Sequence, residues 1–120
     1  MEPLSGYLLL GKKLVEDPVT FSNAWNIGPL TNDVLTVKKV VEKALEVFGK
    51  GHYSTPPQLK QPHEAKLLQL DIAKATEKLN WTPKLNSADA IAWTMKWYKE
   101  ATPKNATELT LQQINQYQQL

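Results

Sequence analysis

A chain of 120 residues has room for one domain, and we expect residues 1–120 to form a single domain. Its net charge is only +2, and all 14 basic residues are lysines. Arginine, whose planar fork grips phosphate and guanine, is absent, so no nucleic-acid partner is expected. Cysteine is also absent, which excludes disulfides, thiolate metal sites and cysteine nucleophiles.

No apolar run approaches the roughly 20 residues that a membrane-spanning helix needs. The N-terminus has only a short apolar stretch, with no basic segment before it, so a signal peptide is not expected. The lack of cysteine fits a reducing compartment. We therefore expect a cytoplasmic protein with no membrane partner.

The first elements are a helix and a short strand. Apolar residues at helical spacing predict a helix over Leu4–Glu16, which begins near Pro3 and ends at Asp17-Pro18. Residues Phe21–Ile27 read as a short strand with Trp25 and Ile27 on one face.

The clearest helix starts at Val34 or Thr36 and runs to Phe48, with a broad apolar stripe opposite charged residues. Gly49 is a natural stop for this helix, which also accounts for the Gly49-Lys-Gly51 pattern.

The stretch Pro62–Pro83 predicts a loop, a short strand near Leu67–Leu70 and a helix over Ile72–Leu79. Asp71 is placed to cap that helix. Behind it, Trp81 and Pro83 are expected to pin the helix end to a sheet.

Two more helices follow. The first, Ala88–Ala101, opens at Asn86 or Ser87 and carries apolar stripes on nearly opposite faces, which predicts a neighbour beyond this small domain. The second is predicted to open at the capping box Thr110-Leu-Gln-Gln113. Together these elements predict an α+β, helix-rich fold with a few short strands and no complete Rossmann sheet.

The residues lack most recognisable catalytic machinery. No glycine-rich phosphate loop follows a strand, no tyrosine has a lysine four positions later, and no serine lies in an elbow motif. His52 and His63 are eleven positions apart without a third convergent ligand, so no metal site is expected. We therefore expect no catalytic residue within the chain.

Five stretches, in this order, carry a resemblance to a known family. They resemble the C-terminal part of the CDP-glucose 4,6-dehydratases, a branch of the extended short-chain dehydrogenases that act on nucleotide sugars. The similarity covers essentially the whole chain. The stretches are EPLSGYLLL, AWNIGP, PHEAKLLQLDIAKATEKLNWTPKL, AIAWTMKWYKE and LTLQQINQY.

The resemblance implies an NAD-dependent lyase that converts CDP-glucose to CDP-4-keto-6-deoxyglucose, on the way to the dideoxy sugars of surface polysaccharides such as the O-antigen of lipopolysaccharide. In that family the NAD fold and the Ser/Thr–Tyr–Lys machinery lie upstream of the part this chain resembles. The chain alone is therefore expected to bind no cofactor and to be inactive, so the residues leave its status as an enzyme open.

The resemblance also implies a binding site for a CDP-sugar nucleotide. Glu64 matches an acidic position that accepts hydrogen bonds from the ribose hydroxyls in relatives, and a solvated loop carboxylate is the alternative. His63 is a candidate to stack on or bond to the nucleotide. Lys60 stands where many relatives carry an arginine and is a candidate phosphate contact.

Two other readings stay open. The chain could be a non-catalytic module that self-associates as a homo-oligomer or docks to a partner such as a Rossmann-domain half. It could also be part of another nucleotide-sugar dehydratase or epimerase, because these residues do not identify the base.

Overall fold

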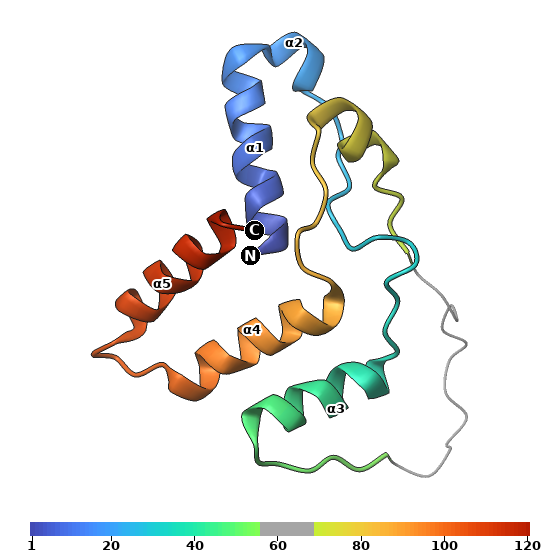
Figure 1. Cartoon of the computed structure of the whole chain (residues 1–120). Coiled ribbons are helices and arrows are strands. Elements are labelled where there is room, and N and C mark those ends of the chain that lie inside the picture. The colour runs from blue at the N-terminus through green and yellow to red at the C-terminus, as the bar shows by residue number, and fades with distance from the viewer. Residues whose placement is uncertain (56–68) are drawn as a thin grey trace.

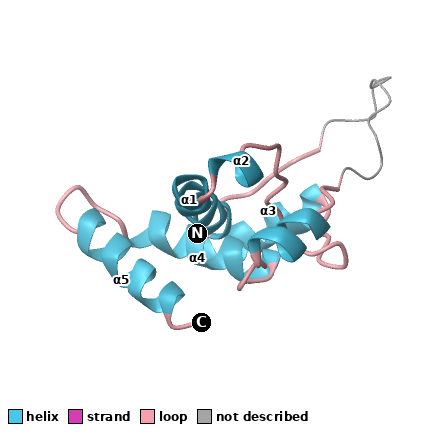
Figure 2. Cartoon of the chain, turned by 90° about the horizontal axis from the view of Figure 1, so that it is seen from above, coloured by secondary structure: helices cyan, strands magenta, loops and turns pink. Residues whose placement is uncertain are grey.

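The computed structural model describes residues 1–55 and 69–120. Within these ranges the chain is built from helices and irregular segments, and it contains no β-strand (Figure 2). The helix-rich prediction is confirmed, whereas the short strands of the predicted α+β class do not form in the described residues. The elements are α1 (Glu2–Glu16), α2 (Pro18–Phe21), α3 (Val37–Phe48), the single π-helical turn η1 (Ala75–Leu79), α4 (Ser87–Glu100) and α5 (Ala106–Gln118).

The strand predicted over Phe21–Ile27 is wrong. Its first residue ends α2, and the rest is irregular because none of the described residues forms a strand that could offer a ladder of hydrogen bonds. The side-chain amide of Asn26 instead donates to the backbone carbonyl of Asp71 at 3.0 Å. Of the strand predicted near Leu67–Leu70, the two described residues are irregular, and the other two lie outside the described ranges.

Capping chemistry explains where the predicted helices begin and end. The Thr36 hydroxyl accepts a hydrogen bond from the Lys39 amide at 3.3 Å, and Gly49 ends α3 in the left-handed conformation with φ 81°. The Asn86 side chain accepts from the Asp89 amide at 2.8 Å and so caps α4. These local signals were readable in the sequence, and the predicted limits of both helices are confirmed to within a few residues.

The predicted start of the last helix is wrong. The supposed capping residue Thr110 lies in the second turn of α5, where its hydroxyl donates to the carbonyl of Ala106 at 2.7 Å. The same hydroxyl accepts a hydrogen bond from the Trp97 indole of α4 at 3.0 Å. The helix begins earlier because Thr110 is used in a helix–helix contact and not as a cap.

The helices form a thin, open arrangement (Figures 1 and 2). The principal extents are 52 × 43 × 22 Å. The radius of gyration is 17.5 Å, compared with about 13.6 Å for a compact domain of this length. Helices α3, α4 and α5 follow one another across one side of the molecule, and α1 with η1 forms the other side. The chain therefore covers itself less completely than a typical domain of its size.

The small core lies where η1 meets α1. Ile72, Ala75, Leu79 and Trp81 form a buried apolar cluster. Partly buried residues of α1 and of the segment after it pack against this cluster: Leu9, Leu10, Phe21, Trp25 and Ile27. Trp25 and Ile27 thus share a buried face as predicted, although they are not on a strand.

The helical segment of residues 73–79, whose last five residues are η1, has nearly the ends that the sequence predicts for Ile72–Leu79. The Asp71 side chain accepts from the Ala73 amide at 2.8 Å, which confirms its capping role, and Asn80 closes the turn with a positive φ of 54°. Trp81 is 4% exposed, and its indole donates to the Ser5 hydroxyl at 2.9 Å. The helix end is therefore pinned to α1 and not to a sheet, which corrects the predicted partner.

The first turn of α1 is held by its own acidic side chain. The two carboxylate oxygens of Glu2 accept hydrogen bonds from the backbone amides of Lys84 and Leu85 at 3.0 and 2.8 Å. The buried Tyr117 hydroxyl, on α5, donates to the same carboxylate at 2.8 Å. Burial raises the pKa of Tyr117 above its ordinary value, and Glu2 raises it too, although the hydrogen bond with Ser5 opposes the shift.

The two apolar faces of α4 are met within the chain. Ile91 lines one cavity with Val40 of α3. On the other side, the Trp97 indole bonds to α5, and the Gln113 side chain donates to the Trp93 carbonyl at 2.9 Å. Helix α4 lies between α3 and α5 (Figure 1). Helices α3 and α5 cover these faces only in part, since no residue of α4 is buried and Tyr98 is 63% exposed, so the need for a further neighbour stays a prediction.

Candidate functional site

The three residues predicted to bind the nucleotide sugar are Lys60, His63 and Glu64. All three lie outside the described residues, so their binding role stays a prediction. The described chain resumes at Gln69, five positions after Glu64. Gln69 and Leu70 line a cavity formed by described residues, and this cavity is the candidate site.

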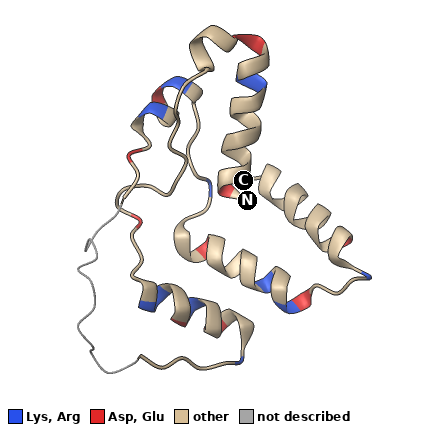
Figure 3. Cartoon of the chain, turned by 180° about the vertical axis from the view of Figure 1, so that it is seen from behind, with Lys and Arg blue, Asp and Glu red and all other residues tan. Residues whose placement is uncertain are grey.

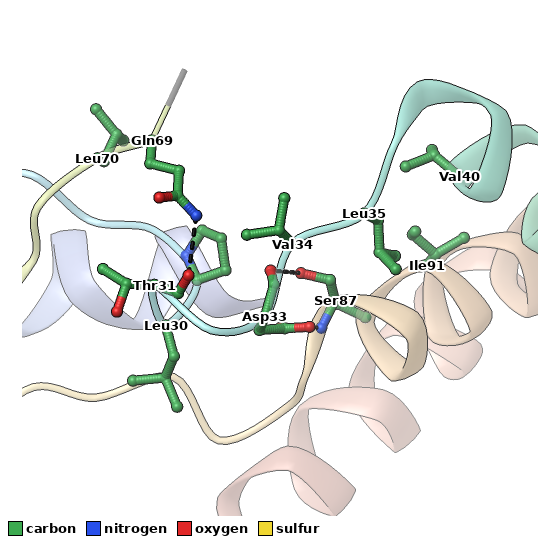
Figure 4. A pocket seen from close by; sticks show the side chains of 12 residues that line it. Leu30, Thr31, Asp33, Val34, Leu35, Val40, Gln69, Leu70, Ser87 and Ile91 are labelled. Carbon is green, nitrogen blue, oxygen red and sulfur yellow. Dashed lines mark hydrogen bonds between the residues drawn. The ribbon is translucent and has the colours of Figure 1, made fainter. Parts of the chain in front are cut away.

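The cavity has a volume of about 510 Å³ and lies between the segment before α3, residues 69–70 and the start of α4 (Figure 4). Its walls are mainly aliphatic, with a few polar groups at one side. Aliphatic walls with few polar groups suit a flat or apolar ring whose orientation those groups define. The lining residues are Pro29, Leu30, Thr31, Asp33, Val34, Leu35, Val40, Gln69, Leu70, Ser87, Ala90 and Ile91.

The polar side of the cavity is held by hydrogen bonds between segments far apart in sequence. The Asp33 carboxylate accepts from the Ser87 backbone amide at 2.6 Å, and the Ser87 hydroxyl donates to the Asp33 carbonyl at 3.4 Å. The Gln69 amide donates to the Thr31 carbonyl at 2.9 Å (Figure 4). The two bonds between Asp33 and Ser87 fix the loop before α3 against the first turn of α4, and the third bond fixes residue 69 to the same loop. The side chains and backbone groups that make these bonds are the polar groups that a ligand in the cavity would meet.

Nothing in the described part of the cavity resembles a catalytic centre. No group of three or more histidine, aspartate or glutamate side chains that could hold a metal ion occurs in residues 1–55 and 69–120. Asp33 is the only carboxylate on the described cavity wall, and this carboxylate accepts a hydrogen bond from the Ser87 backbone amide. The described wall is therefore suited to binding and orienting a molecule.

Asp71 and Lys74 both have structural roles, and for Asp71 the sequence predicts this role. Asp71 caps η1. The Lys74 ammonium donates to the Asn23 side chain at 3.0 Å and to the Ala24 carbonyl at 2.9 Å, and it lies 4.6 Å from the centre of the Trp25 ring. These contacts hold the segment after α2 against η1, so Lys74 is used within the fold.

Sequence reasoning missed Asp33, Gln69 and Ser87 as wall residues. Ser87 carried a signal, since it was a candidate for the start of α4. Asp33 and Gln69 carried none, because their partners lie 54 and 38 positions away in the chain. No helix in the part of the chain that the structure describes is long and apolar enough to cross a membrane.

Comparison with known proteins bears on the resemblance stated from the sequence. No family model matches the chain. Over 99 residues the chain is 34% identical to CDP-glucose 4,6-dehydratase of Salmonella typhimurium. The resemblance to this enzyme is confirmed. The match covers 82% of the chain and 28% of the enzyme, so the chain spans less than a third of the length of this relative.

Proposed function

We propose that the chain is the C-terminal, substrate-binding portion of a CDP-glucose 4,6-dehydratase-like lyase, and that it contacts the nucleotide sugar through Glu64, His63 and Lys60. The observation that carries this proposal is the 34% identity over 82% of the chain. The matched enzyme is named for its action on CDP-glucose.

The described fold supports a binding role within that enzyme. The mainly aliphatic cavity is lined by Gln69 and Leu70, which follow the Glu64 segment directly in sequence. NAD would be held by the portion of the enzyme that has no counterpart here, and that cofactor would carry the redox chemistry. The chain alone would bind the nucleotide without turning it over.

Titration with CDP and with CDP-glucose tests the binding role. If Glu64 accepts hydrogen bonds from the ribose, Glu64→Ala should weaken binding by roughly tenfold or more, because a hydrogen bond to a charged group contributes about 1.5–3 kcal/mol. Glu46→Ala is the matched control, since Glu46 is an exposed carboxylate on α3 that pairs with Lys43. Equal affinities of the two variants would show that Glu64 is not a ligand.

An activity assay tests the second half of the proposal. The purified 120-residue chain, supplied with NAD and CDP-glucose, should form no 4-keto product, because the residues lack both a glycine-rich loop and a tyrosine–lysine pair. Turnover by this chain would overturn its assignment as a portion that depends on another for catalysis.

A further inference from the structure

A second cavity lies between α4 and α5, apart from the candidate site. It has a volume of about 120 Å³, and none of its lining residues also lines the candidate site. Helix α5 returns toward α4 after the turn at residues 101–105, and hydrogen bonds join the two helices (Figure 1). We call this cavity the α4–α5 cleft. Two indoles and three glutamine side chains make up most of its wall: Trp93, Trp97, Gln112, Gln113 and Gln116.

The α4 wall of the cleft presents the two indole rings. Trp93 and Trp97 are four positions apart, so they lie on the same side of the helix. The Trp97 indole donates to the Thr110 hydroxyl at 3.0 Å, and its ring forms a T-shaped contact with Tyr98, with 5.3 Å between the ring centres. These contacts fix the orientation of the Trp97 ring without a ligand. A ring held in this way is a rigid apolar platform that loses little conformational entropy on binding.

The α5 wall of the cleft presents amide groups. Glu108 is the single charged residue in the sequence of this helix (Figure 3). The Gln113 side chain donates to the Trp93 carbonyl at 2.9 Å, and the Gln112 side chain donates to Glu108 at 3.2 Å. Each bond uses an N–H group and leaves the side-chain oxygen as an acceptor. Gln116 is exposed one turn further on, so its amide can turn toward a ligand in the cleft.

This combination of groups indicates the class of ligand. A pyranose ring has a face of C–H bonds that packs on an indole, and hydroxyl groups at its edge that bond to amides. The cleft is smaller than the about 300–1,000 Å³ of sites for drug-sized molecules, so it suits a single ring. Its charged residues are one lysine and one glutamate, Lys96 and Glu100, which favours a neutral ligand over a phosphate or a cation.

We propose that the α4–α5 cleft binds a neutral monosaccharide ring. The ring stacks on the indoles of α4, and its hydroxyl groups bond to Gln112, Gln113 and Gln116. This site goes beyond the proposed function, because it is a separate cavity that takes no nucleotide and uses none of the residues assigned to the CDP-sugar. It rests on the groups that line the cleft and not on the match to a known enzyme.

Titration with methyl glycosides of glucose, galactose and mannose tests the site. The readout is the indole N–H signals of the full 120-residue chain in nitrogen–proton NMR spectra, because two of its four tryptophans line the cleft. Trp25 and Trp81 belong to the core around η1 and serve as internal controls. With at least one glycoside, the signals of Trp93 and Trp97 should shift saturably while those of Trp25 and Trp81 stay in place. No saturable shift with any of the three would overturn the proposal.

A matched pair of variants assigns the binding to the cleft. Gln116 and Gln118 are both exposed on α5, and of the two only Gln116 lines the cleft. Gln116→Leu should weaken glycoside binding about threefold or more, because it removes hydrogen bonds to the hydroxyl groups of the sugar. Gln118→Leu should leave the dissociation constant unchanged. Equal effects of the two variants would contradict the proposal, and both exposed substitutions should leave the fold intact.

Two competition experiments separate the cleft from other sites. Glycoside binding that persists in Glu64→Ala and in excess CDP supports a separate sugar site. If CDP displaces the glycoside, or if Glu64→Ala weakens its binding as much as Gln116→Leu does, the glycoside occupies the nucleotide-sugar site and the cleft proposal is wrong. Cytidine that shifts Trp93 and Trp97 at lower concentration than any glycoside would show that the cleft takes a base and not a sugar.

Discussion

The two faces of α1 differ sharply in how far they are buried. The inner face packs on the buried cluster around Leu79 and Trp81, with Ser5 bonded to the Trp81 indole. The outer face presents Leu8 and Val15 almost fully to solvent. The same fifteen-residue helix therefore has one face that packs on the core and one apolar face that is exposed.

This difference shows how the chain divides its stabilising interactions. Burial of apolar side chains contributes roughly 1.5–3 kcal/mol each, and only the inner face gains it in the isolated chain. The outer face contributes to stability only when another surface covers it. Substitutions on the inner face should therefore act in the isolated chain, and substitutions on the outer face should act in a larger assembly.

The largest expected effect is at the centre of the inner contact. Trp81→Ala removes a nearly buried ring and its hydrogen bond to Ser5, so the free energy of unfolding should fall by about 3–5 kcal/mol. Urea titration followed by circular dichroism measures the loss. Tyr98→Ala, at a residue that is 63% exposed, is the control and should change little. Equal losses would mean that the core is not where α1 meets η1.

Gly6 should be the next most sensitive position. Gly6→Ala places a methyl group 2.8 Å from Ile27, a distance that forces one element to move. Overpacking of this kind costs about 1–3 kcal/mol, which should exceed the gain in helix propensity that alanine brings. The same urea titration shows whether Gly6→Ala lowers or raises the free energy of unfolding. A stabilised Gly6→Ala variant would show that the inner face is loosely packed.

The contact of Tyr117 with the first turn of α1 makes the stability of the chain depend on pH. Its raised pKa means that the folded state holds the phenolic proton more tightly than the unfolded state. This contribution is complete below the ordinary value of 10.0 and is lost as pH rises through the higher folded value. Tyr117→Phe should lower the unfolding free energy by about 1 kcal/mol near pH 7 and should weaken its fall above pH 10. If the unfolding free energy of the wild type and of Tyr117→Phe changed identically above pH 10, the pKa of Tyr117 would not be the cause of the change.

The smallest expected effect lies on the outer face and has the opposite sign. Gly11→Ala adds a methyl group into open space and restricts the unfolded chain, so the isolated chain should gain about 0.5–1 kcal/mol. Thermal melting of Gly6→Ala and Gly11→Ala side by side provides the measurement. A destabilised Gly11→Ala variant in the isolated chain would mean that the outer face is already covered there.

Local signals in the sequence predicted the helices well. Thr36, Asn86 and Gly49 act within a few residues of their own positions: the first two begin a helix and the third ends one, as expected. Asp71 is also a local cap. The resemblance to the dehydratase needed no structure, since it rests on ordered stretches of sequence and is confirmed by the match to a known enzyme.

The errors have a common cause, which is contact over long sequence separations. In the sequence Thr110 resembles a helix cap, but in the structure its hydroxyl accepts a hydrogen bond from Trp97 of another helix. The segment ending at Ile27 resembled a strand, but Asn26 bonds to Asp71, 45 positions away, and residues 1–55 and 69–120 contain no strand to pair with it. The cavity wall formed by Asp33 and Ser87 likewise joins positions 54 apart. The spacing of apolar residues within one segment does not predict which distant residues that segment will contact.

The carboxylate of Glu2 has a consequence for engineering the chain. It joins the first turn of α1 to residues 84 and 85 and, through Tyr117, to the last turn of α5. The two ends of the polypeptide are thus held within reach of one another, and a flexible loop between them would cost little closure entropy. New termini opened in the turn between α4 and α5 would then give a circularly permuted protein with the same clamp intact.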